Sequence, residues 1–294
     1  IKQRIVMIVS TVSQALLWAV LGLGIFVTFR ILNFPDMTTE GSFPLGGAVA
    51  VTLLTQGVHP VLATLAAVLA GCMAGLVTGL LYTKGKIPTL LAGILVMSSC
   101  HSVILFIMGR ANLGLLNTNR LQDLLPFSDQ VNSLLLGLGG VALVIAALMF
   151  FLYTKLGQAF IATGDNPDMA RSFGIYTSRM ELLGLVLSNG IIALAGALIA
   201  QQEGYADVSR GIGVIVVGMA SLIIGEVLYG NLTMLERLLA IAVGAIFYQF
   251  LILGVISLGI NTSYLRIFSA MILAICLMVP ELRNKVLKGA SLSR

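Results

Sequence analysis

Long apolar runs alternate with short polar segments along the whole chain. A helix rises about 1.5 Å per residue, so about 20 apolar residues cross the hydrocarbon core of a membrane. The pattern predicts spans at residues 5–29, 60–82, 87–109, 131–153, 180–201, 211–229, 237–258 and 264–281. No run alternates apolar and polar residues throughout, which argues against a β-barrel. We therefore expect an all-α, polytopic transmembrane helical bundle that forms a single domain over residues 1–294.

One apolar run, at residues 43–57, is too short for an ordinary span. It follows the first span after a polar segment that contains two helix breakers, Pro35 and Gly41. We interpret it as a broken or half helix, which brings the expected total to eight or nine membrane helices. Backbone that is not helical is tolerated at membrane depth only inside protein or beside a water-filled cavity.

The composition supports a membrane location. Only 10% of the 294 residues are charged and 58% are hydrophobic, whereas a soluble domain carries about 25% charged residues. Such a chain cannot cover a water-facing surface, so a lipid bilayer must cover much of it. The net charge of +5 comes from basic residues at the ends of apolar runs, which favours membrane orientation over nucleic-acid binding.

The polar segments 31–42, 110–130, 154–179 and 202–210 separate the spans, and their charges predict an orientation. If the longest segment, 154–179, lies in the cytoplasm, ten Lys and Arg residues are cytoplasmic and five are external. The opposite topology reverses this ratio. Because cytoplasmic loops are enriched in Lys and Arg, we expect an external N-terminus and a cytoplasmic C-terminus.

Catalytic and metal-binding patterns are missing from the sequence. The nearest approach to a phosphate-binding loop, Gly79 to Ile87, has the wrong glycine spacing and no hydroxyl residue after Lys86, so the chain is not expected to hydrolyse ATP. His59 and His101 are far apart, and the three cysteines lie in apolar runs without metal-ligand spacing. We expect no catalytic residue, no metal and no cofactor in this chain.

Polar residues around the break are the candidates for a solute pathway. Asp36 and Glu40 lie near membrane depth, where ionised side chains are costly, and the positive end of a half helix attracts anionic groups. A hydrated inner loop is the alternative interpretation. On the cavity interpretation, the predicted pathway residues, with two from the span at 87–109, are Asn33, Asp36, Thr38, Thr39, Glu40, Ser42, Ser98 and His101. For His101, a hydrogen bond between helices is the alternative.

Two further patterns within the spans have structural interpretations. Gly71, Gly75 and Gly79 repeat every four residues and predict close packing of helices inside the subunit, with a role in dimerisation as the alternative. Glu226, inside an apolar run, either reaches toward the inner end of its span or has a functional role.

The inner segment 154–179 contains a short helix of its own. Asn166 and Pro167 are a helix-start signal, and Gly174 is a stop signal, so a surface helix is predicted at about 166–173. Its flanking glycines and charged residues indicate a contact for another protein. The candidate residues are Gly164, Asp165, Asn166, Pro167, Met169, Ala170, Arg171 and Gly174.

Two stretches resemble a known family. LGQAFIATGDNPDMARSFGI (156–175) resembles the inner-loop signature of the permeases for branched-chain amino acids and ribose in ATP-binding-cassette importers. The stretch 17–50 is similar to the first two helices of the amino-acid type, including the polar break, and the branch linked to tryptophan and tyrosine uptake is the most similar. The chain departs from the family at Gly225-Glu226, where a pair of glycines is common.

The resemblance implies a permease subunit in a bacterial plasma membrane. Two permease copies would form the pathway as a homodimer, two cytoplasmic ATPases would bind ATP and Mg²⁺ and grip the inner-loop helices, and a periplasmic or extracellular substrate-binding protein would dock outside. The expected cargo is a small polar solute, first an amino acid and alternatively a sugar or nucleoside. From the residues alone, a stand-alone secondary transporter or channel is the second hypothesis, and an intramembrane enzyme, lacking a catalytic constellation, is the third.

Overall fold

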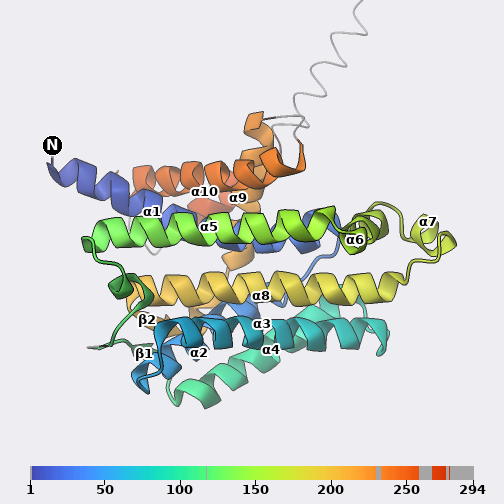
Figure 1. Cartoon of the computed structure of the whole chain (residues 1–294), viewed down its shortest axis with the longest axis horizontal. Helices are drawn as coiled ribbons and strands as arrows, with labels where there is room; N and C mark the ends of the chain where they lie inside the picture. The colour runs from blue at the N-terminus through green and yellow to red at the C-terminus, as the bar shows by residue number, and fades with distance from the viewer. Residues whose placement is uncertain (1, 117, 230–232, 258–266, 276–277, 279–294) are drawn as a thin grey trace, which may run out of the picture.

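The chain folds into a bundle of long helices (Figure 1). The computed structural model describes residues 2–116, 118–229, 233–257, 267–275 and 278. Its labelled α-helices are α1 (Lys2–Ile25), α2 (Thr39–Thr55), α3 (Pro60–Thr83), α4 (Thr89–Met108), α5 (Asp129–Tyr153), α6 (Lys155–Asp165), α7 (Pro167–Ser172), α8 (Thr177–Glu203), α9 (Val214–Tyr229) and α10 (Met234–Ser257). The shorter elements are the π-helix η1 (Phe26–Ile31), the 3-10 helices η2 (Leu121–Leu124) and η3 (Val208–Gly211), and the strands β1 (Asn112–Gly114) and β2 (Tyr205–Asp207).

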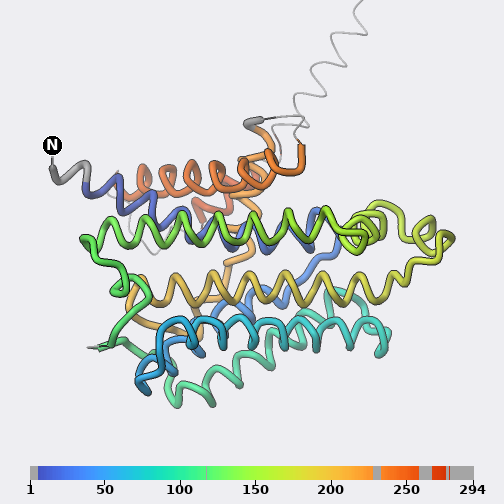
Figure 2. Tube along the Cα trace, in the orientation of Figure 1, coloured from blue at the N-terminus to red at the C-terminus, as the bar shows by residue number. Residues whose placement is uncertain are grey.

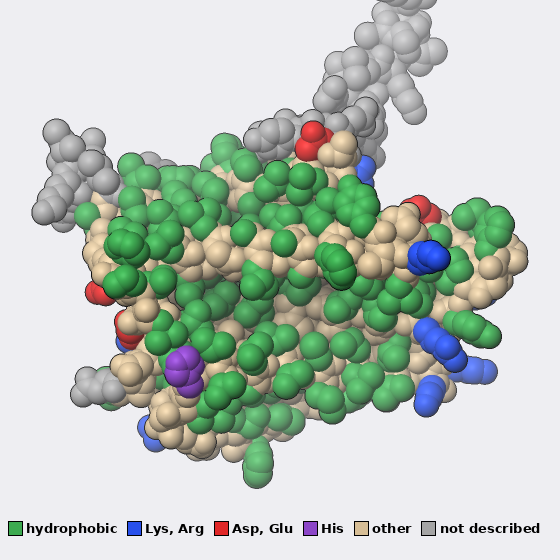
Figure 3. Space-filling view, in the orientation of Figure 1, with side chains coloured by type: hydrophobic (Ala, Val, Ile, Leu, Met, Phe, Trp, Pro, Cys, Tyr) green, Lys and Arg blue, Asp and Glu red, His purple; other side chains and the backbone are tan. Residues whose placement is uncertain are grey.

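The predicted polytopic helical bundle is confirmed. Within the described residues, seven helical stretches are long and apolar enough to cross a membrane, and they coincide with the first seven predicted spans. The eighth, 264–281, is helical at 267–275 and 278 and otherwise lies outside the described residues. Hydrophobic side chains cover the long flank of the bundle in Figure 3, as expected for a surface that faces lipid.

The two ends of the bundle carry different loops. The antiparallel pair β1–β2 joins the segment after α4 to the segment after α8, and it lies at the same end as the start of α1 (Figure 1). Helices α6 and α7 project from the opposite end, where Lys and Arg side chains gather in Figure 3. The structure thus groups 110–130 with 202–210 and separates both from 154–179, the grouping that the charge pattern predicts.

The glycine stripe of α3 packs inside the subunit, as the sequence predicts. A Cβ atom at Gly71 would overlap the carbonyl oxygen of Asn189, and one at Gly75 would overlap that of Leu185, so α3 and α8 meet through their backbones. Helix α2 meets α8 in the same way, because a Cβ atom at Gly46 would overlap the backbone of Ala193. Helices α2, α3 and α8 therefore form one tightly packed group.

Helices α9 and α10 form a second pair of this kind. A Cβ at Gly225 would overlap the carbonyl oxygen of Ala240, and one at Gly244 would overlap that of Ser221. Helix α1 lies between the two groups, and its residues Leu17, Leu21 and Leu23 are fully buried. The pair α9–α10 is connected to α2, α3 and α8 by the segment from β2 through η3.

The first span and the short helix are separated by an irregular segment, as predicted. Helix α1 continues as η1, and the chain then turns through residues 33–38 into α2 (Figure 2). Helix α2 begins at Thr39, four residues before the predicted start at 43. Pro44 is inside α2 and provides no N–H, so the carbonyl of Glu40 lacks its usual helical donor. Gly211 packs on this carbonyl and on the Pro44 ring, where a Cβ atom would not fit.

Candidate functional site

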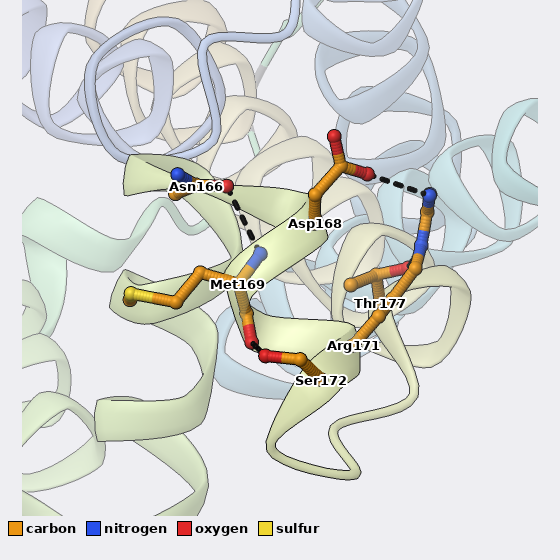
Figure 4. A network of polar contacts seen from close by, with 6 residues as sticks. All are labelled: Asn166, Asp168, Met169, Arg171, Ser172 and Thr177. Atoms are coloured by element: carbon orange, nitrogen blue, oxygen red, sulfur yellow. Dashed lines mark hydrogen bonds and ion pairs between the residues drawn. The ribbon is translucent and has the colours of Figure 1, made fainter.

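The predicted surface helix of the inner segment is present as α7. The side chain of Asn166 caps it by accepting a hydrogen bond from the Met169 N–H at 3.0 Å, and Pro167 occupies its first turn. Gly174 ends it with a φ of +82°, a conformation that favours glycine. The predicted range 166–173 therefore agrees with the observed Pro167–Ser172 and its caps. Figure 4 shows the hydrogen bond between Asn166 and Met169.

Arg171 connects α7 to the next membrane helix. Its Nη1 lies 3.2 Å from Asp168 Oδ1, and its Nε donates to the Thr177 hydroxyl at 3.1 Å (Figure 4). Thr177 begins α8, so Arg171 has a partner within the chain's own inner segment. The contact fixes the orientation of α7 relative to α8.

The exposed surface of the α7 region is partly apolar. Met169 is 46% exposed, and Phe173 and Tyr176 are 76% and 69% exposed. Ala170, by contrast, is fully buried, and it packs α7 onto the subunit. The sequence prediction included Met169 and Ala170 but missed Phe173 and Tyr176. Aromatic residues on both sides of Gly174, within a polar loop, were the signal that could have identified them.

Gly164 has a packing role. It is buried, and a Cβ atom there would overlap the carbonyl oxygen of Ile31 in η1. Asn33 donates from Nδ2 to the Gly164 carbonyl at 3.2 Å, and its φ of +53° turns the chain at this point. Asn33 is exposed and lies beside α6, at the end of the bundle that carries α7. Asp165 is exposed next to the α7 cap.

Asp36 is the centre of a buried polar cluster. The side chain is fully buried; Oδ1 accepts from the Thr38 N–H at 2.9 Å, and Oδ2 accepts from Asn189 Nδ2 at 2.7 Å. Ser42 donates to the Oδ1 atom of the same Asn189 at 2.6 Å. Because Asn189 lies near the middle of α8, the cluster is at mid-depth of the bundle.

The threonines of the break complete this cluster. The hydroxyls of Thr38 and Thr78 are 2.7 Å apart, and the Thr39 hydroxyl donates to the Asp36 carbonyl at 3.0 Å. Thr38, Thr39 and Ser42 have no exposed surface in the subunit. The hydroxyl groups of these three side chains make their hydrogen bonds to α3, to α8 or within the break itself, so they face the interior of the subunit.

Glu40, Ser98 and His101 are brought together at a separate cavity of about 340 Å³. Its other lining residues come from the start of α2, from α4 and from the η3 segment, and they include Met97, Ile104 and Ile212. Glu40 Oε1 accepts a hydrogen bond from the Gly213 N–H at 3.0 Å. Ser98 donates to the Ile94 carbonyl at 2.9 Å, whereas His101 makes no side-chain hydrogen bond within the described residues.

Glu226 forms an ion pair with Arg30. The distance from Arg30 Nε to Glu226 Oε1 is 2.7 Å, and the second nitrogen of the guanidinium also contacts the carboxylate. The pair joins η1 to α9, and Arg30 is half-exposed. Among the described residues no group of His, Cys, Asp and Glu side chains has the arrangement of a metal site.

Comparisons with known proteins are consistent with this architecture. The family described as "Branched-chain amino acid transport system / permease component" matches residues 7–277. The tyrosine transport system permease protein of Clostridioides difficile is 42% identical over 266 residues, which are 90% of this chain and 88% of that protein. The autoinducer 2 import system permease protein LsrC of Salmonella paratyphi B is 26% identical over 76% of this chain and 63% of its own length.

A solved structure has the same fold. The structure of PsaBC from Streptococcus pneumoniae in complex with Fab matches with a TM-score of 0.57 and 16% sequence identity. The match covers 96% of this chain and 93% of that chain. At this identity the likeness bears on the fold alone.

The buried cluster generates a prediction about stability. Replacing Asn189 with Leu removes the partner of both Asp36 and Ser42, and a buried polar group left unpaired costs about 1–3 kcal/mol, more when it is charged. We expect Asn189→Leu to lower the thermal unfolding temperature of the detergent-solubilised protein clearly. Ser99→Ala, at an exposed serine of α4, is the matched control and should leave it unchanged. Equal unfolding temperatures for the two variants would contradict the role of the cluster.

Proposed function

Because the chain belongs to the family of permease components of branched-chain amino acid transport systems, we propose that it forms the membrane pathway of an amino-acid importer as a homodimer. Permease components of this kind work with ATPase and substrate-binding partners, so ATP hydrolysis takes place in another subunit. The amino-acid cargo is supported by the extended similarity to the tyrosine transport permease of Clostridioides difficile.

The orientation follows from the basic residues. We place α6 and α7 in the cytoplasm and the β1–β2 end outside, so that Lys84, Lys86, Lys155, Arg171 and Arg179 are cytoplasmic. In this orientation α7 is directed toward the ATPases and the β1–β2 end toward a substrate-binding protein. The N-terminus is then external. The C-terminal basic residues from Arg283 onward, which the cytoplasmic count includes, lie outside the described residues.

Cysteine labelling tests this orientation. In a variant whose three native cysteines are replaced, a membrane-impermeant thiol reagent should label Ser172→Cys only after the cytoplasmic side is opened. It should label Leu116→Cys in intact cells, because this residue is 86% exposed at the opposite end. The reverse labelling pattern would refute both the orientation and the assignment of α7 to the ATPase side.

The contact with the ATPase is assigned to α7 and the residues that follow it. Exposed apolar side chains outside the membrane are common anchors of protein interfaces, and Met169, Phe173 and Tyr176 provide them here. Asn166, Pro167 and Gly174 define the helix, and Arg171 ties it to Thr177 at the start of α8. A force applied to α7 is therefore transmitted to a membrane helix. Asp165 and Asp168 are exposed charges on the rim of this surface.

Polar replacement of the apolar anchors tests the coupling. Phe173→Ser with Met169→Ser should weaken copurification of the ATPase by more than about tenfold, since interface anchors contribute about 2 kcal/mol or more each. Substitutions of exposed residues change folding stability by within about 0.5 kcal/mol, so membrane abundance should not fall. Leu116→Ser, at an apolar residue that is 86% exposed and follows β1 at the opposite end, is the control. Wild-type ATPase binding and transport in the double variant would disprove the assignment.

The pathway is assigned to the cavity of Glu40, Ser98 and His101. All three are polar groups on apolar helices near mid-depth, where lipid contact is unfavourable, and a second copy of the permease packed against α4 would enclose them. The Glu40 carboxylate suits the ammonium group of an amino acid. The buried residues Asp36, Thr38, Thr39 and Ser42 hold the start of α2 in place and so position Glu40.

Two substitutions separate transport from assembly. Glu40→Gln keeps an oxygen for the Gly213 N–H but removes the charge, and His101→Leu removes the unpaired imidazole. A lost hydrogen bond to a charged solute corresponds to about 1.5–3 kcal/mol, so amino-acid uptake should fall about ten- to a hundredfold at low substrate. Ser99→Ala, at an exposed serine of α4 that does not line this cavity, is the control. Full uptake by both variants, with normal membrane abundance, would place the pathway elsewhere.

A further inference from the structure

A second and larger cavity, of about 670 Å³, lies on the other side of the η3 segment. Ile212 lines both cavities, and the larger one extends along α1, α9 and α10 toward the β1–β2 end. Its volume is within the range of about 300–1,000 Å³ that small-molecule sites occupy. Neither the proposed ATPase contact nor the proposed solute pathway includes this cavity.

The end of the cavity nearest β1–β2 carries two opposite charges, Asp207 and Arg210. Asp207 accepts hydrogen bonds from the N–H and hydroxyl of Ser209 and from Asn112 Nδ2, the last at 3.1 Å. A carboxylate offers about four acceptor positions, so one remains. Partial burial raises the pKa of Asp207, but the hydrogen bonds from Ser209 and Asn112 outweigh it and hold the pKa below the ordinary value.

Arg210 also has unused hydrogen-bonding capacity. One terminal nitrogen contacts the carboxylate of Glu203, whereas the other, Nη1, has no hydrogen-bond partner in the described part of the chain and is not among its buried unpaired atoms. A guanidinium carries five N–H donors in a fixed fork, which matches a carboxylate. The two side chains therefore provide a cationic and an anionic group, three residues apart in sequence, on one wall of the same cavity.

The deeper wall of the cavity is amphipathic. Trp18, Val214, Val217 and Ile252 are apolar or aromatic, and Tyr248 is almost fully buried beside them. Between α10 and α1, Gln249 Nε2 donates a hydrogen bond to Gln14 Oε1 at 3.3 Å. A ligand that extends from the charged end to this wall must carry both charges at one end and an apolar or aromatic group at the other.

We propose that this cavity is an entry site for a zwitterionic amino acid with an apolar or aromatic side chain. The α-carboxylate binds Arg210, the α-ammonium group binds Asp207, and the side chain lies against Trp18 and Tyr248. This assignment rests on the proposed importer function and adds a site within the permease itself, upstream of the Glu40–His101 cavity. A sugar or a nucleoside lacks the pair of charges, and a fatty acid has a carboxylate but no ammonium group.

The chain offers a direct reporter, since Trp18 is its one tryptophan. The full-length permease in lipid nanodiscs is titrated with L-phenylalanine while the tryptophan fluorescence is recorded. We expect a saturable change in fluorescence. Phenylalaninamide, which lacks the carboxylate, and 3-phenylpropionate, which lacks the ammonium group, should bind at least tenfold more weakly. Ribose and decanoate should produce no saturable change.

Two variants make the test specific. Asp207→Asn keeps an oxygen for Ser209 and should weaken phenylalanine binding at least tenfold. Asp129→Asn, at an exposed carboxylate of α5 outside the cavity, is the matched control and should bind as the wild type does. If phenylalanine, its two analogues and decanoate all give the same response, or if none gives one, the entry site is refuted. Amino-acid uptake by the complete transporter separates the two ideas: uptake without a Trp18 response refutes this site only, and absence of uptake refutes the proposed cargo.

Discussion

The hydrogen bonds of one buried carboxylate organise the centre of this subunit. Asp36 lies at mid-depth of a bundle whose flank faces lipid, and a polar group at that depth needs partners inside the protein. Asn189 and the Thr38 N–H provide them. This requirement places the break between η1 and α2 against the middle of α8. The Thr38–Thr78 contact then brings α3 to the same point, and the glycines of α3 allow the approach.

This cluster fixes the position of the start of α2. Glu40 directly follows the buried threonines. Its side chain accepts a hydrogen bond from the Gly213 N–H, and its carbonyl packs against Gly211. The segment around Ile212 is thereby fixed between two cavities, one with Glu40 and His101 and one with Asp207 and Arg210. The polar residues of this cluster thus pair with one another inside the subunit, whereas Glu40 and His101 line a cavity beside it.

Local patterns predicted much of the fold. Span length and hydropathy located seven helices within a few residues, and the Asn166-Pro167 start with the Gly174 stop located α7. The sequence could not tell which polar residues of the break point into protein and which into a cavity. That distinction depends on residues distant in sequence, such as Asn189 for Ser42 and Gly213 for Glu40. The start of α2 was also placed too late, because the cluster stabilises its first turn in spite of Pro44.

The contacts between glycines and facing backbones have a mechanical consequence. Where two helices touch through their main chains, as α3 and α8 do at Gly71 and Gly75, no layer of side chains is left to rearrange, so sliding or tilting would force atoms to overlap. The group α2–α3–α8 and the pair α9–α10 are therefore two rigid groups of helices. The backbone that joins them runs through Gly211, Ile212 and Gly213, and the φ of +83° at Gly213 is open to glycine alone at little cost. This short segment is the direct backbone connection between the two groups, and its contacts with Glu40 at Gly211 and Gly213 tie the second group to the first.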